Sequence, residues 1–179
     1  MKQKSKETQN FGSVIKMPLG LSQEVCKKSV DMLNQVLADT MTLRDMYKKH
    51  HWQLAGPTFY QLHLLFDKHY SEQDELIDTI AERIQTLGGI SIAMSKEILE
   101  TTTIPSPPKG REDVYIQIQR LLDAHEIILK KVRLFARKAA DIGDDGSNDL
   151  LISDVLRTNE KEVWFVFEHS VNASLLGAK

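Results

Sequence analysis

Apolar residues recur at helical spacing in four long stretches of this chain, and glycine, proline and aspartate cluster between them. The pattern predicts helices over about residues 22–52, 58–87, 111–142 and 147–175, with Ser22 and Ser147 as capping residues. The apolar positions expected in the core from the second and fourth helices are Phe59, Phe66, Tyr70, Ile77, Ile80, Ile84, Leu151, Val155, Val163, Phe167 and Val171.

The connections between these helices differ in length. Two are short, whereas residues 90–110 form a long connection in which Ser95 to Thr101 is predicted to form a short helix. This loop pattern is typical of a ferritin-like four-helix bundle, so we expect an all-α fold with a short helix in the long crossover between helices two and three. Residues 1–20 lack periodicity and are expected to form a flexible, lysine-bearing arm before one domain over residues 21–179.

Composition narrows the class of protein. The 179 residues carry a net charge of -2, so a nucleic-acid contact would need a local patch, for which Lys2, Lys4 and Lys6 are candidates. The single cysteine, Cys26, excludes a disulfide framework. No apolar run approaches the ~18 residues of a membrane span, and no apolar segment follows the first lysines. We therefore expect a cytoplasmic protein that does not enter membranes.

The second helix carries a stripe of possible metal ligands. At ~100° per residue, His63, Asp67, Asp74, Asp78 and Glu82 fall within about 100° of the helix surface. His63 and Asp67 are four residues apart, as are Asp78 and Glu82, so each pair can reach a common point. The two pairs are ~16 Å apart along the axis, too far to share one ion.

A second copy of the chain would remove this difficulty. Packed antiparallel about a two-fold axis, it would bring one copy's His63 and Asp67 beside the other's Asp78 and Glu82, which gives two equivalent centres. His51 could add a second imidazole. Such a mixed nitrogen and oxygen ligand set suits Fe(II), and zinc or manganese could substitute.

Three stretches carry a family resemblance: His51-Trp52 with Gly56 and Phe59, then Leu62-His63 with Phe66-Asp67, then Asp78 with Ala81-Glu82-Arg83-Ile84. In these motifs the chain resembles the Dps family (DNA-binding protein from starved cells), the miniferritins. The resemblance implies a hollow homododecamer with a ferroxidase centre at each two-fold interface. His51, His63 and Asp67 would come from one subunit, and Asp78 and Glu82 from its mate.

The resemblance also implies roles for other residues. Trp52 matches the family's tryptophan beside the centre, and Asp145 and Asp149 are candidates for lining acidic pores. The arm with Lys2, Lys4 and Lys6 resembles arms that bind DNA without sequence preference, which would associate the protein with the nucleoid.

Simpler interpretations exist for several residues. The five ligand candidates could form a solvated polar face with an interface ion network, and Asp74 could be an interface carboxylate or lie just outside the centre. His50 and His69 are expected on the surface, although either could be an extra ligand or a proton relay. Trp164 and Phe165 are expected to serve packing.

The functional prediction is a ferroxidase that oxidises Fe(II), with hydrogen peroxide preferred over dioxygen, stores the ferric mineral in its cage and so protects DNA. The alternative is an architectural protein that compacts DNA, in which the metal positions serve assembly. A weaker third option is an oligomeric helical protein without iron chemistry.

Overall fold

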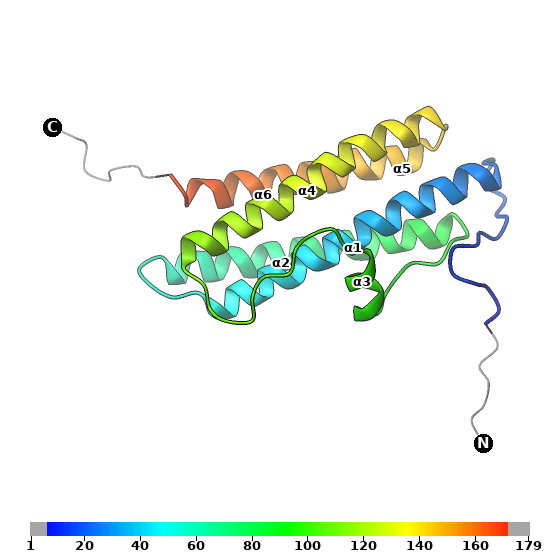
Figure 1. The fold of residues 1–179 in the computed structure, drawn as a ribbon. Coiled ribbons are helices and arrows are strands. Elements are labelled where there is room, and N and C mark those ends of the chain that lie inside the picture. Colours follow the sequence, from blue (N-terminus) through cyan, green and yellow to red (C-terminus); the bar gives the residue numbers. More distant parts are fainter. Residues whose placement is uncertain (1–6, 172–179) are drawn as a thin grey trace, which may run out of the picture.

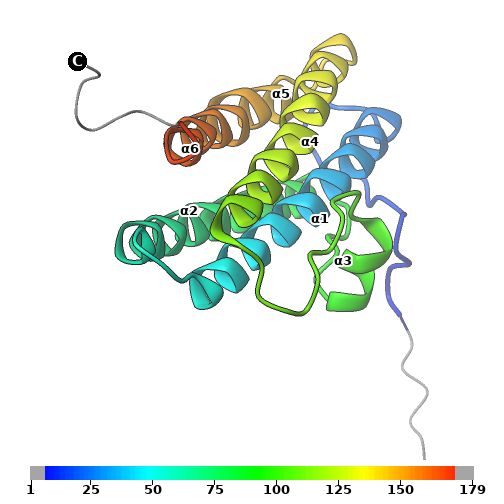
Figure 2. The ribbon, with the colours of Figure 1, turned by 60° about the vertical axis from the view of Figure 1, so that its left-hand side comes forward.

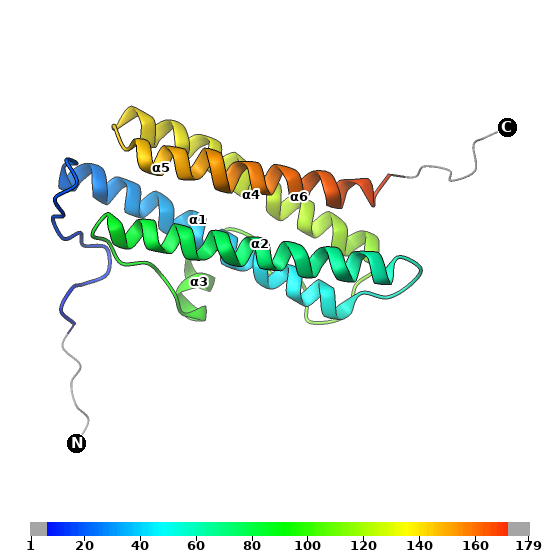
Figure 3. The same cartoon turned by 180° about the vertical axis from the view of Figure 1, so that it is seen from behind.

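A computed structural model describes residues 7–171, and all regular structure in this range is helical. Two layers form the bundle, one of α1 and α2 and one of α4 with the last helix (Figures 1 and 3). The elements are α1 (Gln23–Gln53), α2 (Phe59–Thr86), α3 (Ser95–Thr101), α4 (Val114–Asp141), α5 (Asp145–Asp149), the π-helix η1 (Leu150–Leu156) and α6 (Arg157–Glu168). The predicted four-helix bundle with a short crossover helix is confirmed.

Capping side chains decide where the helices begin. The Ser22 hydroxyl accepts from the backbone N–H of Val25 at 3.2 Å, as predicted. The fourth helix begins at Asp145 because the Asp144 carboxylate caps it, accepting from the N–H of Ser147 at 3.1 Å. Ser147 was predicted as this cap and is instead the donor. Likewise Asp113 caps α4, so that helix begins at Val114 rather than near residue 111.

The inward face of the fourth helix differs from the predicted one. Leu151 and Val155 are buried as expected, but Phe167 and Val171 are about half exposed. The predicted positions are separated by multiples of four residues, and each step of four advances ~40° beyond a full helical turn, so Val163, Phe167 and Val171 rotate progressively away from the face of Val155. Beyond η1 the buried positions are Asn159, Glu162 and Val166.

The second helix buries most of its predicted apolar face. Phe66, Ile77, Ile80 and Ile84 are in the core, whereas Phe59 is 42% exposed and Tyr70 is partly exposed. Phe59 lies in the first turn of α2, where its ring stacks against His63 at 5.1 Å between centroids. Phe59 therefore covers one side of the candidate ligand instead of filling the core.

A buried carboxylate anchors the long crossover to the bundle. α3 packs against α1 (Figure 2). Just after α3, the backbone N–H of Thr103 donates to Asp39 Oδ1 at 2.7 Å. Lys131 of α4 approaches Asp39 Oδ2 at 2.6 Å. Asp39 is fully buried in α1, so one side chain joins α1, the crossover and α4.

The segment before α1 contacts the far end of α2. The N–H of Ile15 donates to the carbonyl of Gly88 at 2.8 Å, and the side-chain amide of Gln9 donates to the same oxygen at 3.0 Å. Gly88 has a φ of +80°, and a Cβ there would overlap the carbonyl oxygen of Ile15. The arm boundary at residue 20 stays a prediction, but residues 9–15 already lie on the bundle.

None of the helices described between residues 7 and 171 is both long and apolar enough to cross a lipid bilayer.

We predict that Asp39→Ala lowers the free energy of unfolding by about 2 to 3 kcal/mol, because it removes charge-assisted hydrogen bonds from a buried position. Urea denaturation measures the change. Asp31→Ala is the matched control, since Asp31 pairs with Lys27 on the exposed side of the same helix and should change stability by less than about 0.5 kcal/mol. Equal losses in the two variants would contradict the anchoring role of Asp39.

Candidate metal-binding site

Two histidines meet where α1 ends and α2 begins, because Gly56, at a φ of +101°, turns the chain back. His51 Nδ1 lies 2.8 Å from the carbonyl oxygen of His63, and His63 Nδ1 lies 3.1 Å from the carbonyl oxygen of His51. The rings stack with centroids 3.7 Å apart. A carbonyl only accepts, so each Nδ1 carries the hydrogen and each Nε2 keeps a lone pair for a metal ion.

A carboxylate completes this group. Asp67 lies one turn beyond His63 on α2, with Oδ1 4.0 Å from His51 Nε2. Lys48 Nζ donates to the same oxygen at 2.6 Å, and this hydrogen bond holds the pKa of Asp67 below its usual range. A ring nitrogen of His51 and an ionised carboxylate therefore lie close together beside the stacked ring of His63, and these donor types suit divalent iron or zinc.

The other predicted ligands lie elsewhere on α2. Asp78 and Glu82 are both exposed and four residues apart, about three turns along the helix from Asp67. Neither carboxylate pairs with a cation of the described residues. Asp74, from the same stripe, accepts from Arg44 at 2.9 Å instead.

The described residues of one chain do not assemble a metal centre. Among residues 7–171, no three side chains of His, Cys, Asp or Glu are arranged to hold one ion. His51, His63 and Asp67 are brought together, while Asp78 and Glu82 form a separate pair. Sharing of the centre between two copies stays a prediction.

His50 and His69 were expected on the surface, and this was wrong, because both are fully buried. Burial lowers the pKa of His50 to about 4 and that of His69 to about 3, so both rings are neutral at physiological pH. His50 points into the end of the bundle from the residue before His51. The prediction assumed that apolar side chains face the core of these helices and polar side chains face solvent. His50 and His69 do not follow that pattern.

A cluster of polar side chains occupies the centre of the bundle, and the sequence pattern did not predict it. We call it the central polar cluster. All of its members are fully buried, and they come from α1, α2, α4 and α6: Tyr47, His69, Gln73, His125, Asn159 and Glu162. The spacing of these residues could have predicted the cluster, because several of them stand at positions where the helical period requires a core residue.

The remaining predicted residues have the following positions. Trp52 is 71% exposed beside His51. Trp164 and Phe165 are 62% and 41% exposed in the single chain, and their packing role stays a prediction. Trp164 and Phe165 belong to α6, and the Phe165 ring lies 6.3 Å from that of His69 between centroids. Asp145 and Asp149 are exposed near the start of the fourth helix, and their pore role stays a prediction. Lys2, Lys4 and Lys6 lie outside the described residues.

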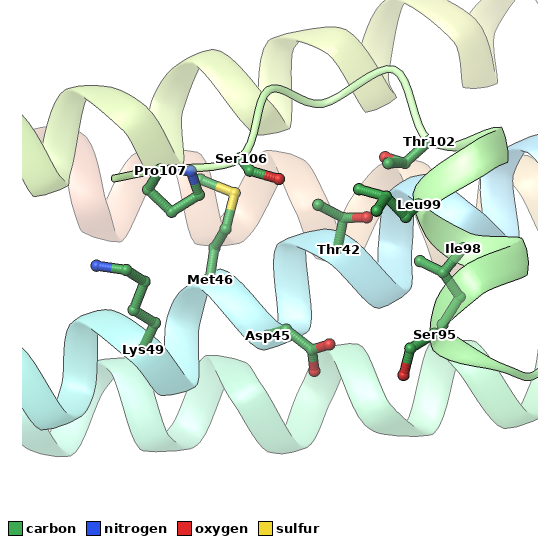
Figure 4. A pocket seen from close by; sticks show the side chains of 10 residues that line it. All are labelled: Thr42, Asp45, Met46, Lys49, Ser95, Ile98, Leu99, Thr102, Ser106 and Pro107. Carbon is green, nitrogen blue, oxygen red and sulfur yellow. The ribbon is translucent and has the colours of Figure 1, made fainter. Parts of the chain in front are cut away.

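A hollow of about 440 Å³ lies between α1, α3 and the crossover, on a different part of α1 (Figure 4). Met46, Ile98, Leu99 and Pro107 give it a mostly apolar lining, with Asp45 and Lys49 at its edge. It contains none of the five predicted ligands, so it is separate from the histidine pair.

The comparisons with known proteins agree with the helical bundle described above. The model of the ferritin-like domain family matches residues 30–175. The structure of DpsC from Streptomyces coelicolor is 51% identical, with a TM-score of 0.95, and the match covers 96% of this chain and 99% of that chain.

Two further relatives are more distant. DNA protection during starvation protein 2 of Bacillus anthracis is 31% identical over 78% of this chain and 94% of that protein. The Vibrio cholerae DPS structure, described as a member of a broad superfamily of ferritin-like diiron-carboxylate proteins, is 27% identical with a TM-score of 0.81, covering 92% of this chain and all of that one.

The buried acid of the central polar cluster gives a testable pH dependence. Burial raises the pKa of Glu162 to about 8, so between about pH 4.5 and pH 8 the folded chain binds a proton that the unfolded chain releases. Stability from this group is therefore lost as pH rises through that window. We predict that Glu162→Gln, which cannot ionise, gains on the order of 3 kcal/mol relative to the parent between pH 5 and pH 8.

Urea unfolding at the two pH values measures this gain. Glu160→Gln is the matched control, because Glu160 is an exposed neighbour on the same helix that pairs with Arg133. It should shift stability equally at both pH values. A Glu162→Gln protein with the parent's pH dependence would contradict the assignment.

Proposed function

Since the chain belongs to the Dps family of ferritin-like proteins, we propose that it oxidises Fe(II) at metal centres shared between two copies of itself. Hydrogen peroxide is the proposed oxidant, and the ferric product is stored inside a dodecameric cage. Removing Fe(II) and peroxide together would protect DNA, in keeping with the name of the Bacillus anthracis relative.

The observation that carries this proposal is the histidine pair. The reciprocal hydrogen bonds of His51 and His63 leave both Nε2 atoms with a free lone pair, and that of His51 lies 4.0 Å from the ionised Asp67. A purely structural pair would gain nothing from leaving two lone pairs unused next to a carboxylate. The arrangement is an incomplete ligand set, and the exposed Asp78 and Glu82 supply the carboxylates that it lacks.

Each residue has a distinct role in this proposal. His51, His63 and Asp67 bind Fe(II) as substrate on one side, and Asp78 and Glu82 of the partner subunit close the other side. Carboxylates are hard ligands that favour the ferric product over Fe(II). Two Fe(II) ions supply the two electrons that reduce one hydrogen peroxide. In the metal-free chain Asp67 is a carboxylate that accepts a hydrogen bond from Lys48, so no proton has to leave before the metal binds.

A complementation experiment tests whether the centre is shared. Chain X carries His63→Ala and Asp67→Ala, and chain Y carries Asp78→Asn and Glu82→Gln. We predict that assemblies of X alone or Y alone do not oxidise Fe(II) with peroxide. Randomly mixed assemblies should recover about a quarter of the parent activity, because half the dimers are mixed and each contains one intact centre. Stopped-flow absorbance of the ferric product gives the rates.

Asp123→Asn with Glu126→Gln is the control, since both residues are exposed carboxylates on α4, away from the stripe. This control should retain parent activity. Mixed X and Y assemblies that stay inactive, although size-exclusion chromatography shows them intact, would refute sharing. Full activity of X alone would refute the metal role of His63 and Asp67.

DNA binding through the N-terminal arm is the second part of the proposal. Lys2, Lys4 and Lys6 precede the residues that are held on the bundle, of which Gln9 contacts Gly88. Copies of such an arm on one cage would add weak phosphate contacts together. The contact would be independent of sequence and would weaken steeply with salt.

We predict that Lys2→Gln, Lys4→Gln and Lys6→Gln together abolish the gel shift of the parent cage on DNA, because the three charges are removed while the contacts of residues 9–15 remain. Titrations at low and moderate salt measure the effect. Lys27→Gln, which removes an exposed lysine of α1, is the control and should leave the shift unchanged. An unaltered shift in the triple variant would contradict the arm as the DNA contact.

A further inference from the structure

The hydrogen-bond directions in the central polar cluster can be assigned by starting from Asn159. Its side-chain amide donates to the carbonyl of Val155 at 2.7 Å, so its oxygen faces His125 Nδ1, 2.8 Å away. His125 Nδ1 therefore carries the hydrogen, and His125 Nε2 keeps a lone pair. Tyr47 Oη lies 2.6 Å from that nitrogen, so the phenol donates its hydrogen to His125. The imidazole of His125 is thus an acceptor inside the bundle.

A second imidazole of the cluster also keeps a lone pair. His69 Nδ1 lies 3.1 Å from Tyr47 Oη, and His69 is the donor because the phenol hydrogen is directed at His125. His69 Nε2 therefore bears no hydrogen. This nitrogen, Gln73 Oε1 and Glu162 Oε1 are buried without a partner among the described residues. All three can accept hydrogen bonds, so the cluster holds more acceptors than donors, and a cation would satisfy them.

Two atoms of the cluster are spaced as ligands of one ion. His125 Nε2 lies 3.5 Å from Glu162 Oε2. Ligands bound at ~2.0–2.2 Å in a tetrahedron are about 3.3 to 3.6 Å apart. The side-chain nitrogen of Gln73 lies 3.0 Å from the same oxygen of Glu162. If the Gln73 amide turned by half a rotation, its unpartnered Oε1 would face the same point as the other two groups.

The surroundings of His125 are those of a metal-binding imidazole. A histidine that binds a metal through one ring nitrogen usually donates the hydrogen of the other to an oxygen, which fixes the ring. Asn159 is the acceptor here, and its own amide is fixed by the backbone of Val155. Burial lowers the pKa of His125 to about 4, so no proton competes for Nε2 at physiological pH.

No cation pairs with Glu162 in the described part of the chain. The titratable and charged groups that face it are Tyr47 from α1, Glu72 from α2, His125 from α4 and Lys161 from α6. Lys161 donates to Glu72 at 2.8 Å. Burial raises the pKa of Glu162 to about 8, and the charge of Glu72 adds to this, so Glu162 keeps its proton at neutral pH. A metal ion beside Glu162 would take the place of that proton.

We infer that the central polar cluster binds one divalent transition-metal ion inside a single chain. His125 Nε2 and the carboxylate of Glu162 are its ligands, and Gln73 Oε1 joins them once the amide has turned. Imidazole with carboxylate and amide oxygen suits zinc, cobalt or divalent iron. This site needs no second copy of the chain and is separate from the histidine pair, so the inference does not rest on the proposed function.

Binding of the ion rearranges the cluster. No three side chains of His, Cys, Asp or Glu converge on a point within residues 7–171, and this set has only two such side chains with an amide. The ion replaces the Tyr47 hydrogen at His125 Nε2, and the hydroxyl then donates to Glu162 Oε1. The O–H bond of Glu162 breaks, and its proton leaves to solvent as the bond from oxygen to metal forms. No electron is transferred.

Cobalt is the probe for this site, used with the assembled protein. Anomalous scattering at the cobalt edge, from crystals soaked in Co(II), locates the bound ions. Equilibrium dialysis counts Co(II) per chain in the parent, in Glu162→Gln and in the control Glu160→Gln, which changes an exposed neighbour on the same helix. Because all other sites are the same in the three proteins, the difference between them isolates the bundle centre.

We expect an anomalous peak bonded to His125 Nε2 and to the Glu162 carboxylate. The parent and Glu160→Gln should each bind one more Co(II) per chain than Glu162→Gln. Since one proton leaves per ion, the affinity of this additional ion should rise about tenfold per pH unit between pH 6 and pH 7.5. A Glu162 that served packing alone would show no such profile. If Glu162→Gln does not fold, the anomalous map of the parent decides the question by itself.

The outcomes separate this inference from the proposed function. Water alone at the bundle centre at saturating Co(II) would overturn the inference, and so would equal Co(II) binding by the parent and Glu162→Gln. Either result, with peroxide-driven Fe(II) oxidation intact, would leave the proposed function standing. A cobalt peak at the bundle centre of a protein that does not oxidise Fe(II) would support the inference and overturn the proposed function.

Discussion

The reciprocal hydrogen bonds between His51 and His63 are the constraint on which the candidate site depends. Each imidazole is bound to the backbone carbonyl of the other residue, so ring orientation and tautomer are set by the α1–α2 turn and not by a ligand. Because both contacts cross the turn, the site is rigid only while Gly56 reverses the chain at that point. The bundle therefore fixes the two free nitrogens before any metal arrives.

The central polar cluster, by contrast, lowers the stability of the same bundle. A buried network of this size is costly unless its hydrogen bonds are made, and His69 Nε2, Gln73 Oε1 and Glu162 Oε1 have no partner among the described residues. The apolar core on either side must hold the helices together around it. Packing alone would favour apolar side chains at these buried positions of α1, α2, α4 and α6.

Much of the fold followed from the chain itself. Ser22 caps α1, the helix from Ser95 to Thr101 interrupts the crossover, and the double glycine ends α2, because these features act over a few residues. One error arose where distant parts of the chain compete. Asp144, and not Ser147, caps the fourth helix, and its carboxylate accepts a hydrogen bond from Arg83 of α2. The error at Phe167 was local, because a residue twelve positions after Val155 lies ~120° around an α-helix, whereas Asn159, Glu162 and Val166 keep the inward face.

For the site, the sequence determined the ligand types and their spacing on one helix. The i to i+4 rule brings His63 and Asp67 together and keeps both far from Asp78 and Glu82, whatever the rest of the molecule does. Only the tertiary structure decided that His51 stacks on His63 and that Lys48 donates a hydrogen bond to Asp67. It also decided that His50 and His69 are buried. Those outcomes depend on how four helices are rotated against one another, and a rotation is set by the packing of all of them at once.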